Sequence, residues 1–112
     1  MDAVKSSPRN RLITIEARTT ALDGYGGESE AWAEYAREYA AVYFGTGKEQ
    51  REAAQQGGSQ TASFEVLSNS KTRAISVINH RIAFDGGIWN ITAKQDLGLN
   101  EGVRLTAIRA AG

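Results

Sequence analysis

The sequence predicts a mainly β fold, a small antiparallel β-barrel or sandwich with one short α-helix and long loops. Two observations favour this class. The segment from Ile82 to Ile91 places apolar side chains at alternate positions on both sides of a glycine-rich turn. Apolar and polar residues also alternate over residues 13–18, 62–66 and 103–107. Several short strands with a single small helix are typical of small barrels and sandwiches.

Composition limits the classes of protein that the chain can belong to. Its 112 residues suffice for one domain with its own core. We expect residues 1–10 to form a flexible arm and residues 11–112 to form a single domain. Thirteen basic and thirteen acidic residues cancel, which argues against a protein that coats nucleic acid, because such binding depends on neutralising phosphates. The absence of cysteine excludes disulfides and thiolate metal sites.

No membrane or secretory segment is expected. The first eleven residues are polar, without the apolar core of a signal peptide. No apolar run approaches the ~20 residues that span a bilayer. We therefore expect a soluble protein that is made in a cytoplasm.

The first strand is expected where Ile13, Ile15 and Ala17 alternate with polar residues. Residues 19–31 then contain three glycines around Tyr25 and predict a long polar loop. Loops of about 12 residues without secondary structure are uncommon in small domains and are often functional. This loop is therefore a candidate functional segment.

The next segment carries two conflicting patterns. Apolar residues recur at helical spacing, and this spacing predicts a helix over about residues 30–40. The aromatic and alanine positions that carry it are Trp32, Tyr35, Ala36, Tyr39 and Tyr43. Val42 and Phe44, however, alternate with Ala41 and Tyr43, which favours a strand at the end of the segment.

A polar helix is predicted over residues 47–57. Thr46 and Glu49 have the spacing of a capping box, in which each side chain binds the other residue's backbone amide. Gly57 and Gly58 provide a stop. Ala53 and Ala54 are almost the only apolar residues, too few for burial to hold the helix. The helix must therefore fray or gain support from a neighbour.

The second half is rich in predicted strands. Ala62, Phe64 and Val66 mark one strand, and residues 103–107 mark the last. Turns are expected over residues 69–71 and 96–102. The apolar residues between positions 75 and 78 show no clear period.

The hairpin is the best-defined element. Asp-Gly and Gly-Gly both tolerate positive φ in a two-residue turn. With either turn, Asp85-Gly86 or Gly86-Gly87, four apolar side chains share one face. These core residues of the hairpin are Ile82, Phe84, Trp89 and Ile91. A three-residue loop would mix the faces, so the hydrophobic pattern favours the shorter turn.

No catalytic, metal-binding or cofactor-binding residue is predicted, and the chain is not expected to be an enzyme. His80 is the only histidine and has no nucleophile or second ligand near it in sequence. Residues 23–28 form a glycine-rich stretch that lacks both the ligand spacing of an EF-hand and the lysine of a phosphate-binding loop. Ordinary structural roles are the favoured interpretation for both.

Taken in order, several segments between residues 11 and 109 resemble the phage head–tail joining proteins. These proteins are also called head closure or stopper proteins, and gene transfer agents contain them too. The matching segments are Arg11-Leu-Ile-Thr-Ile-Glu, Asp23-Gly-Tyr-Gly-Gly-Glu followed by Trp32, Ala41-Val-Tyr-Phe, Gly47-Lys-Glu, Phe64-Glu-Val and Arg81-Ile-Ala-Phe-Asp-Gly-Gly-Ile-Trp-Asn-Ile-Thr. The order and spacing of the first, second and last segments carry the resemblance. The chain departs from the family over residues 69–80, which lack its proline-containing turn.

The resemblance implies a structural head–tail connector of a phage or phage-like particle. Such a protein forms a ring, expected here to be a hexamer, between the portal or adaptor ring and the tail terminator proteins. The ring helps to seal the channel, through which double-stranded DNA passes without sequence-specific binding. Before assembly the protein would be in the host cytoplasm. The family fold also implies a strand over residues 38–45, which we adopt in place of a helix there.

Two polar loops, 19–31 and 45–60, are the candidates for contacts with partner rings or for channel closure. The residues expected to take part are Asp23, Gly24, Tyr25, Gly26, Gly27, Glu28, Lys48, Glu49, Arg51 and Glu52. The alternative function is a small β-barrel nucleic-acid-binding module. Such a module needs a basic groove with exposed aromatic residues, and the neutral balance of charge disfavours it.

Overall fold

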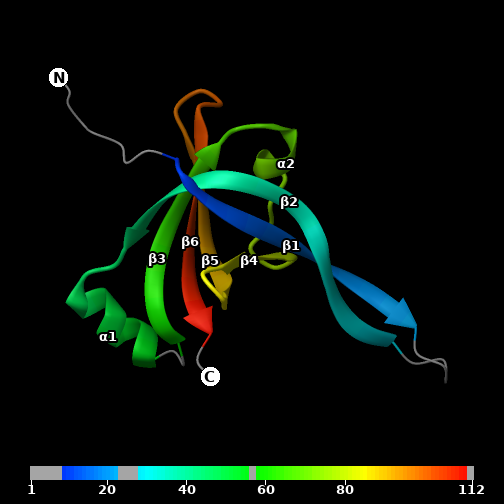
Figure 1. Ribbon diagram of the computed structural model, residues 1–112, viewed down its shortest axis with the longest axis horizontal. Helices are drawn as coiled ribbons and strands as arrows, with labels where there is room; N and C mark the ends of the chain where they lie inside the picture. The colour runs from blue at the N-terminus through cyan, green and yellow to red at the C-terminus, as the bar shows by residue number, and fades with distance from the viewer. Residues whose placement is uncertain (1–8, 23–27, 56–57, 111–112) are drawn as a thin grey trace.

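The computed structural model describes residues 9–22, 28–55 and 58–110. Within these residues, six antiparallel strands close into a barrel in the order β1-β2-β3-β6-β5-β4 (Figure 1). The strands are β1 (Arg11–Leu22), β2 (Glu28–Phe44), β3 (Gly58–Leu67), β4 (His80–Phe84), β5 (Gly87–Leu97) and β6 (Gly102–Ala110). The helices are α1 (Gly47–Gln55) and α2 (Ser70–Arg73). The predicted mainly β class is confirmed, with one short helix more than expected.

The hairpin between β4 and β5 turns at Asp85 and Gly86. Both residues have positive φ, 55° and 74°, as a tight two-residue turn requires. Ile82 is paired with Trp89 across the hairpin. This register directs Ile82, Phe84, Trp89 and Ile91 into the barrel, where all four are buried.

Aromatic rings form the centre of the core. The ring of Phe64 on β3 meets Trp89 and Phe84 edge-on, with centroid distances of 5.4 and 5.5 Å. Edge-to-face contacts of this kind add to the gain from burial. Smaller apolar side chains from every strand complete the core, namely Ile13, Ile15, Ala40, Ala62, Val66, Ile82, Ile91, Val103, Leu105 and Ala107, and Ile75 closes it from the segment after α2.

The prediction of a helix over residues 30–40 is wrong. All of these residues belong to β2, which pairs with β1 from Leu22↔Glu28 to Arg11↔Ala40. A bulge explains the misleading pattern. Ile15 faces Ala36 while Glu16 faces Glu34, so Tyr35 is an extra residue in β2. Because of the extra residue, the adjacent Tyr35 and Ala36 both pack toward the core, as neighbours on a helical face would. Tyr39 does not follow this pattern, since it is 60% exposed. The implied strand over residues 38–45 is confirmed as far as Phe44.

Two predicted loops are largely regular structure. In the loop expected over residues 19–31, β1 continues to Leu22 and β2 begins at Glu28, and Thr19 pairs with Ala31. Strand pairing therefore continues up to both sides of the glycine-rich stretch, whose residues 23–27 lie outside the described part of the chain. The segment 45–60 contains α1 and the beginning of β3.

The turn expected over residues 69–71 is the beginning of α2. The Asn69 side chain accepts hydrogen bonds from the backbone amides of Lys71 and Thr72. In return, the Asn69 amide donates to Thr72 Oγ1 at 2.8 Å. This reciprocal capping box makes the turn helical. The turn expected over residues 96–102 does join β5 and β6, although β5 reaches Leu97.

Candidate functional site

Strands β1 and β2 continue beyond the barrel as a two-stranded ribbon. In the barrel wall, β1 pairs with β4 only over residues 14–17, and β2 pairs with β3 only over residues 41–44. The last backbone link to the wall is the Arg18 amide, which donates to the Asn79 carbonyl at 2.8 Å. We call residues 19–22 and 28–34 the ribbon. Figure 1 shows it extending away from the barrel, in a molecule that measures 61 × 34 × 20 Å.

A ladder of charged and aromatic side chains braces the base of the ribbon. Trp32 lies between two guanidinium groups, with Arg81 Cζ 4.3 Å and Arg18 Cζ 5.7 Å from its ring centroid. Each arginine is paired with a carboxylate, Arg18 with Glu30 at 2.5 Å and Arg81 with Glu16 at 2.6 Å. The ladder joins β1, β2 and β4. Sequence reasoning missed it because residues 19–31 were expected to be a loop, so the cross-strand pairing of Arg18 with Trp32 was not expected.

Helix α2 covers the edge of β2 at the bulge. Tyr35 Oη donates to the Lys71 carbonyl at 2.7 Å, and Lys71 Nζ donates to the Tyr35 carbonyl at 3.0 Å. Asn69 Nδ2 also donates to Glu38 Oε2 at 3.3 Å. Residues 35–38 of β2 are therefore covered, whereas no strand other than β1 pairs with residues 28–34 in the described part of the chain. The ribbon is the segment whose edges the barrel does not cover.

His80 has a packing role at this position. Its ring meets the Tyr35 ring edge-on at a centroid distance of 4.5 Å. The Ser76 amide donates to His80 Nδ1 at 2.9 Å. Partial burial lowers the pKa of His80, because burial disfavours the charged imidazolium. The described residues contain no group of three potential metal ligands. His80 is the first residue of β4.

Hydrogen bonds of Gln50 attach α1 to the barrel. Gln50 donates from Nε2 to the carbonyls of Gly45 and Thr61, and its Oε1 accepts from the Thr61 amide at 2.8 Å. The expected capping box is present, since the Thr46 amide donates to Glu49 Oε1 and the Glu49 amide to Thr46 Oγ1. These bonds lower the pKa of Glu49. The sequence predicts that the polar helix needs support from a neighbour, and Thr61 of β3 in the same chain provides it.

Replacing Gln50 with alanine is expected to loosen α1 while the barrel stays folded. The change removes three hydrogen bonds, each contributing about 0.5–1.5 kcal/mol. We expect hydrogen exchange over residues 47–55 to accelerate roughly tenfold or more, since about 1.4 kcal/mol is a factor of ten, while exchange in β5 and β6 is unchanged. Gln55→Ala is the matched control, because Gln55 is an exposed glutamine of the same helix. Equal exchange in both variants would show that Gln50 does not anchor α1.

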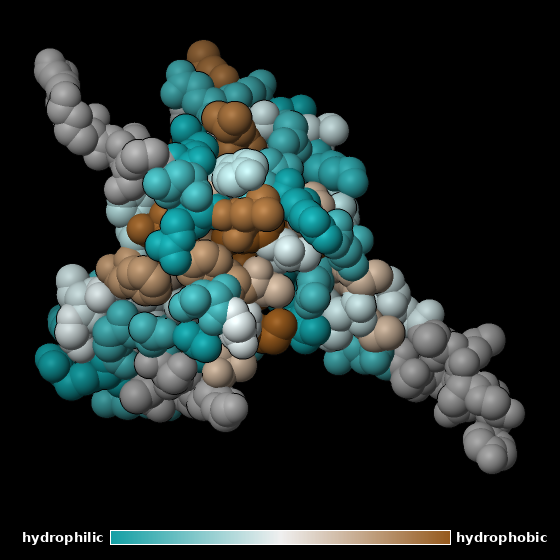
Figure 2. All heavy atoms as spheres, in the orientation of Figure 1, coloured by the Kyte–Doolittle hydropathy of each residue, from teal (hydrophilic) through white to brown (hydrophobic). Residues whose placement is uncertain are grey.

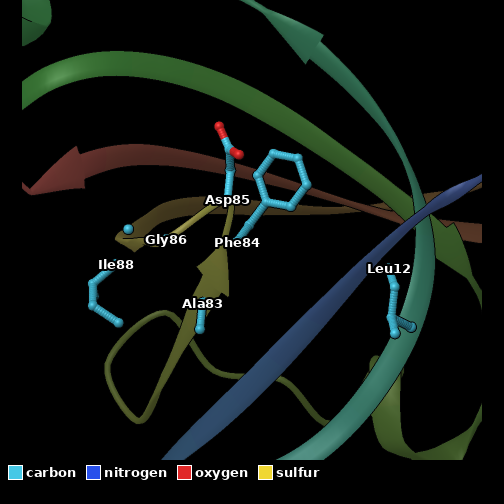
Figure 3. Close-up of a pocket in the computed structure, with 7 residues that line it drawn as sticks. Leu12, Ala83, Phe84, Asp85, Gly86 and Ile88 are labelled. Carbon is cyan, nitrogen blue, oxygen red and sulfur yellow. The ribbon is translucent and has the colours of Figure 1, made fainter.

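The barrel wall has an opening between the beginning of β1 and the β4–β5 turn. We call this cavity the wedge. It has a volume of about 290 Å³ and is lined by Leu12, Ala83, Phe84, Asp85, Gly86, Gly87 and Ile88. Figure 3 shows Leu12 on β1, separated from the residues at the turn. The Arg11 guanidinium lies 4.9 Å from the centroid of the Phe84 ring at this opening.

Several large apolar side chains are exposed on the barrel. They are Leu12, Tyr39, Phe44, Leu67, Val77, Ile78 and Leu99. Figure 2 shows brown hydrophobic surface on the barrel and at the tip of the β5–β6 loop, among hydrophilic surroundings. Leu99 in that loop is 92% exposed. None of these residues was singled out from the sequence as a partner contact.

The structure describes only part of the predicted partner residues. Residues Asp23 to Gly27 lie outside the described residues, and Glu28 is the first residue of β2. Lys48, Glu49, Arg51 and Glu52 belong to α1. Figure 1 shows the ribbon and α1 on opposite sides of the barrel. If both contact partners, they form two surfaces rather than one.

A family model described as phage head completion protein matches residues 4–110. The chain belongs to the phage head completion protein family. This family is structural, so the chain is a structural protein of a phage or phage-like particle, and the predicted family and location are confirmed. As a head completion protein, it assembles with other structural proteins of the particle. No described helix is long and apolar enough to cross a membrane.

Two solved structures share the fold of this head completion protein. One is the solution structure of protein SF1141 from Shigella flexneri 2a, with a TM-score of 0.70 and 17% identity over 99% of this chain and 98% of that chain. The other is a chain from the virion of a native gene transfer agent particle, with a TM-score of 0.65 and 21% identity over 95% of this chain and 100% of that chain. No protein of curated function matches the chain.

Proposed function

We propose that this protein is a head–tail connector, whose copies form a ring between the portal or adaptor ring and the tail terminator. The ring, expected to be a hexamer, helps to seal the channel through which double-stranded DNA passes. Membership of the head completion family supports this role. The similar fold of a chain from a gene transfer agent virion is consistent with it.

The ribbon is the observation that carries the proposal. A two-stranded ribbon is marginally stable by itself in water, and its unpaired backbone groups can pair with another chain. This protein nevertheless extends β1 and β2 beyond the last backbone hydrogen bond to the barrel, at Arg18. Among the side chains that the structure describes, the core residues from β1 and β2 lie no further out than Ile15 and Tyr35. The role of the extension is therefore to contact something outside the protomer.

The ladder at the base of the ribbon supports passage of DNA without tight binding. Arg18 and Arg81 are each neutralised by a carboxylate, which reduces their attraction for phosphates. Both arginines also lie over the Trp32 ring, which leaves less of this ring for stacking on a nucleobase. These contacts favour the connector over the alternative of a nucleic-acid-binding module.

Shortening the ribbon tests the proposal. Thr19 faces Ala31, so residues 20–30 can be replaced with a two-residue Asn-Gly turn that keeps the strands in register. We expect the purified variant to remain folded, because the barrel core is intact. Particles assembled with it should package DNA and then lose at least tenfold more of it than parental particles do, as measured by nuclease-resistant DNA.

Glu30→Gln is the control, because it removes one charge and keeps the ribbon at full length. Particles with this variant should retain DNA and acquire tails as the parent does. Tailed particles that retain DNA at parental levels with the shortened ribbon would rule out a sealing role for the ribbon.

A further inference from the structure

The β5–β6 turn presents an apolar tip that the protomer does not use. Gly98 and Asn100 have positive φ, 59° and 61°, and the Glu101 amide donates to the Leu97 carbonyl at 3.1 Å. This tight turn holds Leu99 outward with 92% of its surface exposed. Leu97, half-buried, lies beside it. We call Leu97 and Leu99 the knob.

A neighbouring strand extends the apolar surface of the knob. Leu97 and Leu67 are both paired with Gly102, one on each side. A Cβ at Gly102 would lie 3.5 Å from Leu97 Cδ1, so the glycine leaves room for the Leu97 side chain. Leu67 is 56% exposed. Leu67, Leu97 and Leu99 therefore form one apolar projection at this end of the barrel.

The wedge offers an apolar lining for such a projection. Its volume of about 290 Å³ and its lining by Leu12, Ala83 and Ile88 suit an entering aliphatic side chain. Two cations lie at its margin. The Arg11 guanidinium covers the Phe84 ring, and the Arg109 guanidinium lies against Gly87, 2.4 Å from the position of an added Cβ.

Carboxylates flank the knob, and the Arg9 guanidinium also lies near it, 3.6 Å from the position of an added Cβ at Gly102. Asp96 and Glu101 flank the leucine turn, and neither carboxylate has an ion-pair partner among the described residues. Arg11 and Arg109 also lack a carboxylate partner in that part of the chain. Complementary charges around an apolar contact favour one orientation of approach. Asp85 is the one carboxylate that lines the wedge.

The knob and the wedge lie at opposite ends of β5. This strand has eleven residues and is about 35 Å long at about 3.3 Å per residue. A protomer therefore cannot insert its own knob into its own wedge. Contact between two different patches on copies of one chain is heterologous, and it gives a closed ring when the rotation between copies closes.

We propose that the knob of one copy inserts Leu99 into the wedge of the next copy, with Asp96 and Glu101 facing Arg11 and Arg109. This contact joins neighbouring protomers of the ring, so the inference rests on the proposed connector function. Near-zero net charge also allows copies to associate without strong repulsion.

Engineered cysteines test the contact in assembled particles, since the natural chain has none. The double variant Leu99→Cys with Ala83→Cys places one thiol on the knob and one in the wedge. Mild oxidation should produce a ladder of covalent multimers on a non-reducing gel, and reduction should abolish it. Each single variant should remain monomeric on the gel, because a heterologous contact brings two different positions together. Ile78→Cys with Ala83→Cys is the matched control, since Ile78 is 72% exposed and lies outside the knob.

Three results would overturn the inference. One is the absence of a disulfide ladder from the double variant. Another is a dimer from Leu99→Cys alone, which would indicate a two-fold contact between knobs. The third is an equal ladder from the Ile78 control.

An amine-reactive crosslinker applied to the same particles separates failure of this inference from failure of the proposed function. If it yields multimers without a disulfide ladder, a ring forms through another surface, and if it yields none, the ring itself is refuted.

Discussion

Replacing Trp89 with alanine is expected to lower the free energy of unfolding by about 3–5 kcal/mol, the range for large aromatic truncations in cores. Trp89 is 1% exposed and packs against the rings of Phe64 and Phe84. Its indole Nε1 also donates to the Phe84 carbonyl at 3.2 Å. The substitution thus removes an apolar group from the centre of the barrel and leaves a buried carbonyl without its donor.

Urea denaturation followed by circular dichroism measures this effect. Phe44→Ala is the comparison variant, because Phe44 touches the same cluster at 6.4 Å from Trp89 but is 51% exposed. It should cost roughly half as much or less, since less apolar area leaves water. An unfolding midpoint for Trp89→Ala equal to that of the parent would show that the ring does not hold the core together.

Replacing Gly45 with alanine is expected to destabilise the protein by about 1–3 kcal/mol, the usual cost of overpacking. A Cβ at this position would lie 2.4 Å from Thr61 Cγ2 and 3.2 Å from Glu49 Cβ. Thr61 is β-branched and has little rotamer freedom. The Gly45 amide also donates to the Thr61 carbonyl at 2.9 Å, so the backbone cannot move away without losing this bond. Urea denaturation and hydrogen exchange over α1 should both detect the change.

Gly87→Ala is the control for this interpretation. A Cβ there would also meet an atom at 2.4 Å, but that atom is Nε of the Arg109 guanidinium. A long flexible side chain can rotate away where a threonine methyl cannot. We therefore expect Gly87→Ala to cost less than Gly45→Ala. Equal costs would mean that distance alone, and not the stiffness of the neighbour, determines the penalty.

The β4–β5 hairpin shows how far local sequence reasoning reaches. Its turn residues and its alternation of apolar side chains are both encoded within ten residues, from Ile82 to Ile91. The capping box of α1 is equally local, with both partners within four positions of each other. Such features follow from backbone preferences and strand periodicity, which need no knowledge of distant residues.

The ribbon and its ladder show where that reasoning ends. Whether residues 19–31 form a loop or two strands depends on the pairing of β1 with β2 and on the bulge at Tyr35. The meeting of Trp32 with Arg81 depends on a third strand, about fifty positions away in the chain. No local propensity encodes these contacts, because their energy arises only when the partners meet.

The sequence by itself determined the β class, the hairpin, the polar helix and the resemblance to head–tail joining proteins. Only the tertiary structure decided that β1 and β2 leave the barrel as a ribbon and that Gln50 anchors α1. It also decided that the wedge and Leu99 lie at opposite ends of β5. The physical reason is separation along the chain. Turns and caps form between near neighbours, whereas closure of a barrel brings together residues whose positions depend on every strand at once.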